Sequence, residues 1–262
     1  MIEALRVHAP DGAVTGARRA GTAGPALIFV HGVGSTAAIW DRQLETFGAR
    51  YRCAAVELRG NGALQPDPVP ASITRAGFAD DVLAVADACD FDRFTLVGCS
   101  LGGVVAFELW TRAPQRLKAM SLVGSFAHYP DARVYADGVK AAVRAAGTMD
   151  AFARARAAKL GLPPARLQET IEQMACKSVP CYLAATEATW TGDYRGLLPA
   201  IDVPAQVLHG ERDTVAPREL SEEIARGIPG ATLTTVEDAG HVANADNPDR
   251  FDALLNEFLQ RS

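Results

Sequence analysis

Short apolar runs alternate along the chain with longer segments of helical spacing, and this alternation constrains the fold more than any other feature. Six runs rich in β-branched or other apolar residues lie at 26–30, 52–56, 94–97, 117–123, 205–208 and 232–236. Because they are apolar on both faces, they predict buried strands of a parallel sheet covered by helices on each side. Two earlier alternating stretches, 3–8 and 14–19, are separated by Asp11-Gly12 and predict an antiparallel hairpin at the edge. The sequence thus predicts an α/β fold with a mostly parallel, eight-stranded sheet flanked by helices.

Helix boundaries can be predicted at two places. Ser72 is a candidate N-cap for a helix whose apolar positions run from Phe78 to Cys89 at a spacing of three or four residues. Near the C-terminus, Asn247 is a candidate N-cap and Pro248 fits the first helical position. We expect this last helix to dock its apolar face on the sheet.

The segment from about residue 128 to residue 197 departs from the alternation. Its roughly seventy residues contain no strand-like run and are too many for a plain loop. We expect a helical cap over the carboxyl ends of the strands, where open α/β sheets bind ligands. The predicted division is an α/β core of residues 1–127 and 198–262 with a cap, or lid, of residues 128–197.

Composition narrows the class of protein. A chain of 262 residues with 48% apolar residues can bury one large core, and a net charge of −5 gives no basic field for nucleic acid or an anionic membrane. We expect no signal peptide or membrane anchor, because no basic run followed by an apolar stretch opens the sequence. The five cysteines are odd in number and show no framework spacing, which favours reduced thiols. These features predict a cytoplasmic protein.

The strongest chemical signal is the segment GCSLGG at residues 98–103, between the apolar run FTLV and a helix predicted at 104–112. This G-x-S-x-G pattern in a strand, turn and helix context predicts that Ser100 is a nucleophile. The turn is so sharp that side chains at positions 98 and 102 would clash, which explains Gly98 and Gly102. Cys99 is not the residue two positions from both glycines, so we do not take it as the nucleophile. The alternative is a glycine-rich turn with an incidental serine.

A serine nucleophile needs a base to remove its proton, and His241 is the best candidate. It stands between the last predicted strand and the last helix, late enough for the chain order serine, acid, histidine. The other histidines are His8, His31, His128 and His209. We interpret His31 and His209 as packing or turn residues at strand ends.

The third residue must be a carboxylate that orients the imidazole. Asp213 follows the run at 205–208 and is the preferred candidate, with a turn residue or helix cap as the alternative. The competing carboxylates are Glu211, Asp238 and Asp246. The other position where such sheets carry an acid, after Val123, holds Gly124 and Ser125 and offers no carboxylate.

Acyl transfer also requires two hydrogen-bond donors for the oxyanion. The backbone N–H of Leu101 is the first candidate, by its position after the serine. The second is expected in HGVGS at residues 31–35, and the N–H of Val33 is our choice. An ordinary tight turn is the alternative interpretation of that loop.

The motifs together resemble a known family. HGVGS followed by Trp40 and Gln43, then VELRGNG, GCSLGG, GERD and DAGHVANADNP, resemble the α/β-hydrolase superfamily across nearly the whole chain. Within it, the sequence is most similar to the 3-oxoadipate enol-lactonase and small esterase group, which includes cofactor-free haloperoxidases. The resemblance implies a triad of Ser100, Asp213 and His241, a carboxylic ester or lactone as the small-molecule substrate, and no cofactor or metal. Serine at the nucleophile position points away from haloalkane dehalogenases and epoxide hydrolases.

Specificity is expected to come from the cap. Candidates to line an apolar substrate pocket are Trp40, Phe126, Tyr129, Met149, Phe152, Trp190 and Tyr194, with core packing as the alternative for each. Arg133 and Arg144 are candidates to meet a substrate carboxylate, although surface positions are the better interpretation. C–C bond hydrolysis, perhydrolysis, a non-catalytic ligand-binding role and homo-oligomerisation remain open.

Overall fold

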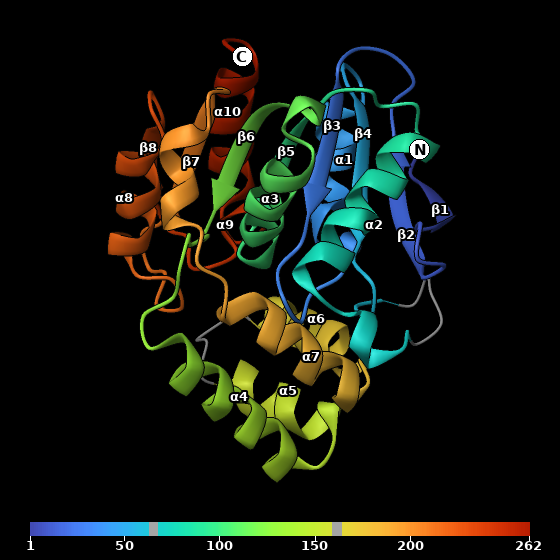
Figure 1. The fold of residues 1–262 in the computed structure, drawn as a ribbon, viewed down its shortest axis with the longest axis vertical. Coiled ribbons are helices and arrows are strands. Elements are labelled where there is room, and N and C mark those ends of the chain that lie inside the picture. Colours follow the sequence, from blue (N-terminus) through green and yellow to red (C-terminus); the bar gives the residue numbers. More distant parts are fainter. Residues whose placement is uncertain (63–67, 159–163) are drawn as a thin grey trace.

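The computed structural model describes residues 1–62, 68–158 and 164–262 and contains an eight-stranded sheet (Figure 1). The strands are β1 (Glu3–His8), β2 (Val14–Ala20), β3 (Ala26–Val30), β4 (Arg52–Glu57), β5 (Phe94–Cys99), β6 (Leu117–Val123), β7 (Ala205–Gly210) and β8 (Thr232–Val236). Their order is β1-β2-β4-β3-β5-β6-β7-β8. Pairing is antiparallel for β1 with β2 and β2 with β4, and parallel elsewhere. The predicted sheet and edge hairpin are confirmed.

Helices cover both faces of the sheet. The α-helices of the described residues are α1 (Asp41–Phe47), α2 (Arg75–Ala88), α3 (Leu101–Arg112), α4 (Ala132–Ala146), α5 (Met149–Ala157), α6 (Pro164–Ala175), α7 (Val179–Trp190), α8 (Arg218–Gly227), α9 (Ala243–Asp246) and α10 (Pro248–Leu259). Apolar side chains of α2, α3 and α8 enter one buried cluster, and those of α1 and α10 enter another. On β3, Ile28 joins the first cluster whereas Leu27 and Phe29 join the second, as the two-residue period of a strand requires. In the described residues, no helix is both long enough and apolar enough to cross a membrane.

One predicted helix cap is wrong and one is confirmed. Ser72 lies in a short 3-10 helix, η2 (Pro70–Ser72), and the cap of α2 is Thr74, whose hydroxyl accepts a hydrogen bond from the Gly77 N–H at 2.9 Å. Thr74 takes the cap because its extended backbone places the hydroxyl over the first turn, whereas Ser72 is already part of the preceding turn. The side chain of Asn247 caps α10 as predicted, accepting from the Arg250 N–H.

Four helices, α4 to α7, lie in sequence between β6 and β7. In Figure 1 they gather at the end of the sheet to which the arrows of β3 and β6 point. They share a buried cluster that includes Val143, Phe152, Ile171 and Tyr182. The helical content expected for this segment is therefore observed, and its division from the core as a cap stays a prediction. Residues 159–163 of the predicted cap and 63–67 of the predicted core lie outside the described residues.

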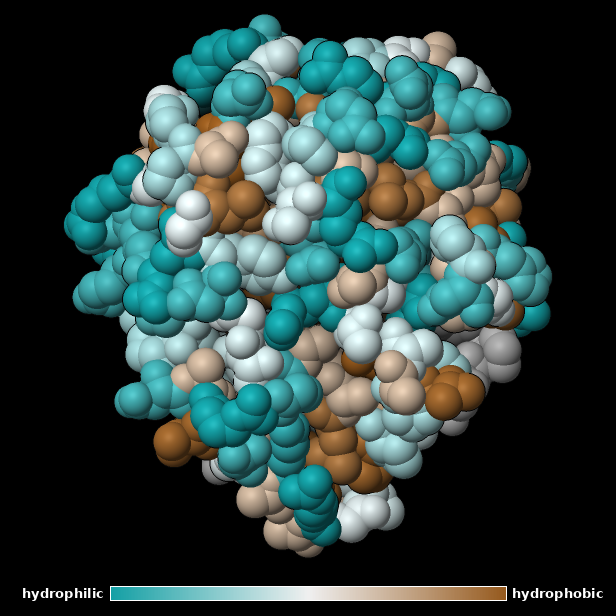
Figure 2. Space-filling model, in the orientation of Figure 1, coloured by the Kyte–Doolittle hydropathy of each residue, from teal (hydrophilic) through white to brown (hydrophobic). Residues whose placement is uncertain are grey.

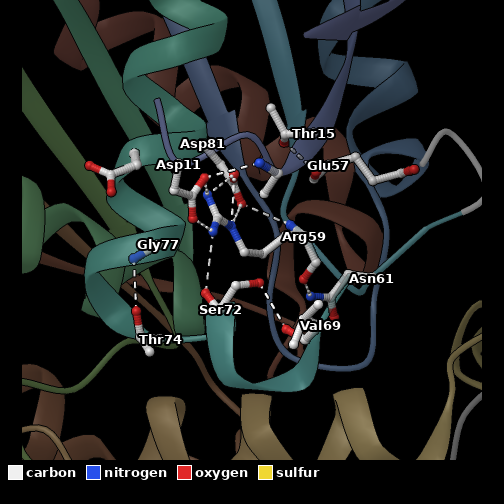
Figure 3. A network of polar contacts seen from close by, with 12 residues as sticks. Asp11, Thr15, Glu57, Arg59, Asn61, Val69, Ser72, Thr74, Gly77 and Asp81 are labelled. Carbon is white, nitrogen blue, oxygen red and sulfur yellow. Dashed lines mark hydrogen bonds and ion pairs between the residues drawn. The ribbon is translucent and has the colours of Figure 1, made fainter. Parts of the chain in front are cut away.

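A buried ion pair fixes the loop that follows β4 (Figure 3). The Arg59 side chain donates to Asp81 of α2 with an Nη2 to Oδ1 distance of 2.8 Å, and the Arg59 N–H donates to Asp81 Oδ2 at 2.8 Å. Arg59 also contacts Asp11 in the β1–β2 hairpin. Burial raises the pKa of Asp81 to about 6, while Arg59 opposes this rise, so the carboxyl is ionised at pH 7. The pair joins the loop, α2 and the hairpin.

Replacing Asp81 should destabilise the fold strongly. Asp81→Ala leaves the fully buried Arg59 charge without its main partner, and we expect the free energy of unfolding to fall by about 3–5 kcal/mol. Urea denaturation measures this loss. The control is Asp80→Ala, which breaks a partly exposed pair with Arg112 and should cost less than about 1 kcal/mol. Equal losses in the two variants would contradict a special role for the buried pair.

Candidate active site

Ser100 occupies a sharp turn between β5 and α3. Its backbone has φ +54° and ψ −111°, a conformation that side chains rarely adopt, and its N–H donates to Val123 O at 2.9 Å. A Cβ at position 98 would lie 2.5 Å from the backbone of Gly102, and a Cβ at position 102 would lie 2.3 Å from Val30 O. The expected steric need for both glycines is therefore met. The helix starts at Leu101, three residues earlier than predicted, because the turn feeds directly into α3.

The neighbouring thiol is not placed for the same chemistry. Cys99 is the last residue of β5 and its side chain is buried with the cluster on the α1 and α10 face. Burial raises the pKa of this thiol far above its ordinary value, so it stays protonated. This agrees with the interpretation of Cys99 as lying outside the nucleophile position.

Ser100 and His241 line a common cavity. Its wall is largely apolar and also contains Val33, Trp190 and Arg156. Ser100 itself is only 3% exposed, so access to its hydroxyl is through this cavity. The sequence-predicted nucleophile and base are therefore brought together at one site.

Asp213 holds the other side of the His241 ring. Asp213 Oδ2 lies 2.9 Å from His241 Nδ1, and Asp213 Oδ1 accepts the N–H groups of Val215 and Ala216 at 2.8 and 2.9 Å. Burial raises the pKa of Asp213, but the nearby His241 ring and the two backbone donors outweigh it and lower the pKa overall. The carboxyl is therefore ionised and can only accept, so His241 Nδ1 carries the proton and Nε2 is left with a free lone pair.

The competing carboxylates have other partners. Asp238 is exposed and pairs with Arg212, and Glu211 accepts a hydrogen bond from the backbone N–H of Asp238. Asp246 accepts from the N–H of Gly240 at 3.0 Å. Of the four candidates, Asp213 is the one whose carboxylate contacts the His241 ring.

Position 124 cannot carry the acid in this structure. A Cβ added to Gly124 would lie 2.7 Å from His241 O and 3.0 Å from His241 Nδ1. The φ of Gly124 is +54°, which disfavours any other residue. The absence of a carboxylate at position 124 is thus also a packing requirement of the histidine loop.

His31 has a more definite role than the packing or turn role interpreted from the sequence. It is completely buried, its Nδ1 lies 2.8 Å from Gly32 O, and its Nε2 accepts the Leu58 N–H at 3.2 Å. These partners require the proton on Nδ1. Burial, with a smaller effect of nearby Lys177, lowers the pKa of His31 to about 3, so the ring is neutral at pH 7. His31 therefore links the loop after β4 to the loop after β3.

The buried, neutral His31 predicts acid sensitivity. Its folded pKa of about 3 lies below the ordinary value of 6.5, so the unfolded chain takes up the proton first as the pH falls. The neutral ring therefore contributes to the free energy of unfolding in full above pH 6.5. This contribution is lost as the pH falls towards 3, by up to about 1.4 kcal/mol per pH unit. We expect the unfolding free energy of His31→Leu to depend less steeply on pH, by about this slope, in urea denaturation between pH 6 and pH 4. Equal slopes for variant and parent protein would contradict the prediction.

Aromatic residues proposed from the sequence to line the pocket fall into two groups. Trp190 lines the cavity, and Phe126 and Tyr129 pack against the Trp190 ring. The Phe126 and Trp190 rings are stacked, with 5.0 Å between their centroids. Trp40 and Tyr194 are not among the described residues that line the cavity of Ser100. Trp40 packs against Phe29 and Phe251 in the core, and Tyr194 packs against Phe107 while its hydroxyl donates to Glu108. For both residues the alternative interpretation, core packing, is the one that the structure shows.

The remaining candidates are not among the described residues that line the cavity of Ser100. Met149 and Phe152 are buried in the cluster shared by α4 to α7, and Phe152 packs against Tyr182. Arg133 pairs with Glu187 and Arg144 is exposed, which agrees with surface positions for both.

Two features of the site were missed by the sequence analysis. Ser35, in the loop after β3, donates a hydrogen bond to Gln173 Oε1 of α6 at 2.7 Å, and this joins the inserted helices to the site. Arg156 on α5 lines the cavity with Ser100. A local pattern could not reveal either, because each depends on where α5 and α6 lie over the sheet.

The largely parallel sheet and the turn that carries Ser100 between β5 and α3 define the class of the protein as a hydrolase with an α/β fold. The sequence model of the alpha/beta hydrolase family matches residues 27–254, and the chain belongs to this family. A pimeloyl-[acyl-carrier protein] methyl ester esterase of Neisseria meningitidis is 30% identical over 89% of this chain and 93% of its own length. A 3-oxoadipate enol-lactonase of Acinetobacter baylyi is 26% identical over 90% and 89%. The crystal structure of an enol-lactonase from Burkholderia xenovorans superposes with a TM-score of 0.84 at 25% identity, covering 95% of this chain and 98% of that one. The resemblance to the enol-lactonase and esterase group is confirmed.

Proposed function

We propose that the protein hydrolyses a carboxylic ester or lactone through an acyl-enzyme on Ser100. The observation that carries the proposal is the shared cavity of Ser100 and His241, together with the Asp213 contact on the far nitrogen of the same ring. The relatives named as a methyl ester esterase and an enol-lactonase support this class of substrate.

The proposed reaction has two halves. Ser100 Oγ attacks the carbonyl carbon while its proton passes to His241 Nε2, and Asp213 stabilises the charged ring. The ester C–O bond then breaks and the leaving oxygen takes the proton from His241; in a lactone this oxygen stays attached to the acyl group. A water molecule next attacks the acyl carbon and gives its proton to His241, which returns it to Ser100 as the acid leaves.

The N–H groups of Leu101 and Val33 are proposed to hold the oxyanion. Leu101 N–H opens α3, where the positive end of the helix dipole adds to its effect. Gly32 O and Val33 N–H belong to one peptide group and point in opposite directions in a trans peptide. Gly32 O is held by His31 Nδ1 and by the Ser35 N–H, at 2.8 and 3.2 Å. The orientation of the Val33 N–H is therefore fixed by the His31 ring and the Ser35 N–H.

The inserted helices are proposed to act as a cap over this cavity. Trp190 of α7 and Arg156 of α5 contribute to the cavity wall, and Gln173 of α6 bonds to the loop that carries Val33. Substrate selection would then depend on these three helices, while bond cleavage depends on the sheet and its loops.

Labelling and a substrate panel test the proposal. A fluorophosphonate probe should label Ser100, as located by peptide mass spectrometry, and 4-nitrophenyl esters and lactones should be hydrolysed. Absence of labelling and turnover would favour a ligand-binding protein without catalysis. Peroxide-dependent bromination or cleavage of a vinylogous diketone, faster than any ester hydrolysis, would replace the proposal by perhydrolase or C–C hydrolase chemistry at the same serine.

A further inference from the structure

Arg156 places a cation in the wall of the Ser100 cavity. It lies near the end of α5, is half-buried, and lines both this cavity and an adjoining one that contains Arg166 and Arg212. The other side of Arg156 meets an open groove between α4 and α5 lined by apolar residues such as Val139 and Phe152. Figure 2 shows apolar residues gathered towards this lower end of the molecule. Arg156 therefore borders three cavities with mostly apolar linings.

The cations of the combined cavity differ in their partners. Arg166 pairs with Glu169 and lies 4.0 Å from Asp246, and Arg212 pairs with Asp238 at 3.1 Å. Arg156, in contrast, has no ion pair or hydrogen bond with any residue that the structure describes. A guanidinium that is partly removed from water and unpaired gains most from an anionic ligand, and its planar fork fits a carboxylate.

We infer that the substrate carries a carboxylate in addition to the ester or lactone bond, and that Arg156 binds this carboxylate. The inference rests on the proposed function, because it concerns the substrate of the same serine. One guanidinium balances one negative charge, so the expected class is a singly charged ester, such as a monoester of a dicarboxylic acid. Arg156 takes no part in bond cleavage; it determines specificity by holding the far end of the substrate.

The test compares charged and uncharged esters of the same length. Mono-4-nitrophenyl succinate, glutarate and adipate carry the carboxylate on the acyl side, and 4-nitrophenyl butanoate, pentanoate and hexanoate are the uncharged counterparts. The acetate ester of glycolate is the substrate that carries the carboxylate on the alcohol side. We expect the parent protein to prefer at least one charged ester, and Arg156→Gln to lower kcat/KM for it by about 10- to 100-fold. For the uncharged counterpart the change should stay within about threefold.

Arg154→Gln is the matched control. Arg154 lies on the same helix, and the substitution removes the same charge, but its side chain is exposed and pairs with Asp150. It should leave the preference for the charged ester within about twofold, because exposed charges are screened by salt. Arg156→Lys, which keeps the charge but not the planar fork, should retain part of the preference.

The outcomes separate the two proposals. If the parent protein hydrolyses esters but shows no preference for a carboxylate, or if Arg156→Gln lowers charged and uncharged substrates alike, the inference is wrong and the serine hydrolase function stands. An equal effect of Arg154→Gln would also overturn it, since the charge would then act at long range. If the parent protein hydrolyses no ester or lactone, the proposed function fails and the inference falls with it.

Discussion

Ser100→Ala is expected to lower kcat for ester hydrolysis by at least about a thousandfold and to abolish fluorophosphonate labelling. The variant removes the oxygen that forms the acyl-enzyme but leaves the turn intact, since the Ser100 N–H still donates to Val123 O. Circular dichroism and urea denaturation should therefore show a folded protein. Initial rates with the best ester of the panel give the measurement.

The control for this variant is Ser35→Ala. Ser35 also lines the cavity, but its hydroxyl is committed to Gln173 of α6. Its loss should reduce kcat/KM by less than about tenfold through a looser contact with α6, and labelling should persist. If Ser100→Ala kept its activity, or if the label moved to Ser35, Ser100 would not be the nucleophile.

Local sequence signals predicted the sheet and the serine turn because their causes are local. The runs that form β3 and β5 are apolar on both faces, and both strands are completely buried. Gly98 and Gly102 follow from the geometry of a single turn, which is the same wherever it lies in the fold. The wrong prediction of Ser72 as the helix cap also has a local cause. Ser72 and Thr74 both carry a hydroxyl and lie two positions apart, so the sequence favours both nearly equally, and the local backbone geometry selects Thr74.

The pocket was predicted less well because its residues meet through the packing of distant elements. Trp190 and Trp40 are both large, buried aromatic residues, yet only Trp190 comes from a helix over the carboxyl end of the sheet. Arg156 gave no signal, since it is one of several arginines in a helical segment. What distinguishes it is the absence of a described partner, which depends on where α4, α6 and α7 place their acidic residues.

Asp213→Asn should lower kcat by about a thousandfold to ten-thousandfold while preserving the shape of the site. Two backbone N–H groups, from Val215 and Ala216, donate to Oδ1 of Asp213. In the variant only the amide oxygen can accept them, so the amide NH₂ must face His241 Nδ1. The ring would then carry its proton on Nε2, towards Ser100, and could no longer act as a base.

Asp238→Asn is the matched control for the acid. Asp238 lies three residues from His241 and is the nearest competing carboxylate in the sequence, but it is exposed and paired with Arg212. Its substitution should change kcat by less than about threefold. Because both variants replace one carboxylate by its amide in the same part of the molecule, a general change of charge cannot explain a difference between them. A larger loss of activity in Asp238→Asn than in Asp213→Asn would contradict this prediction. It would show that the Asp213 contact at His241 Nδ1 does not determine the proton position on the ring.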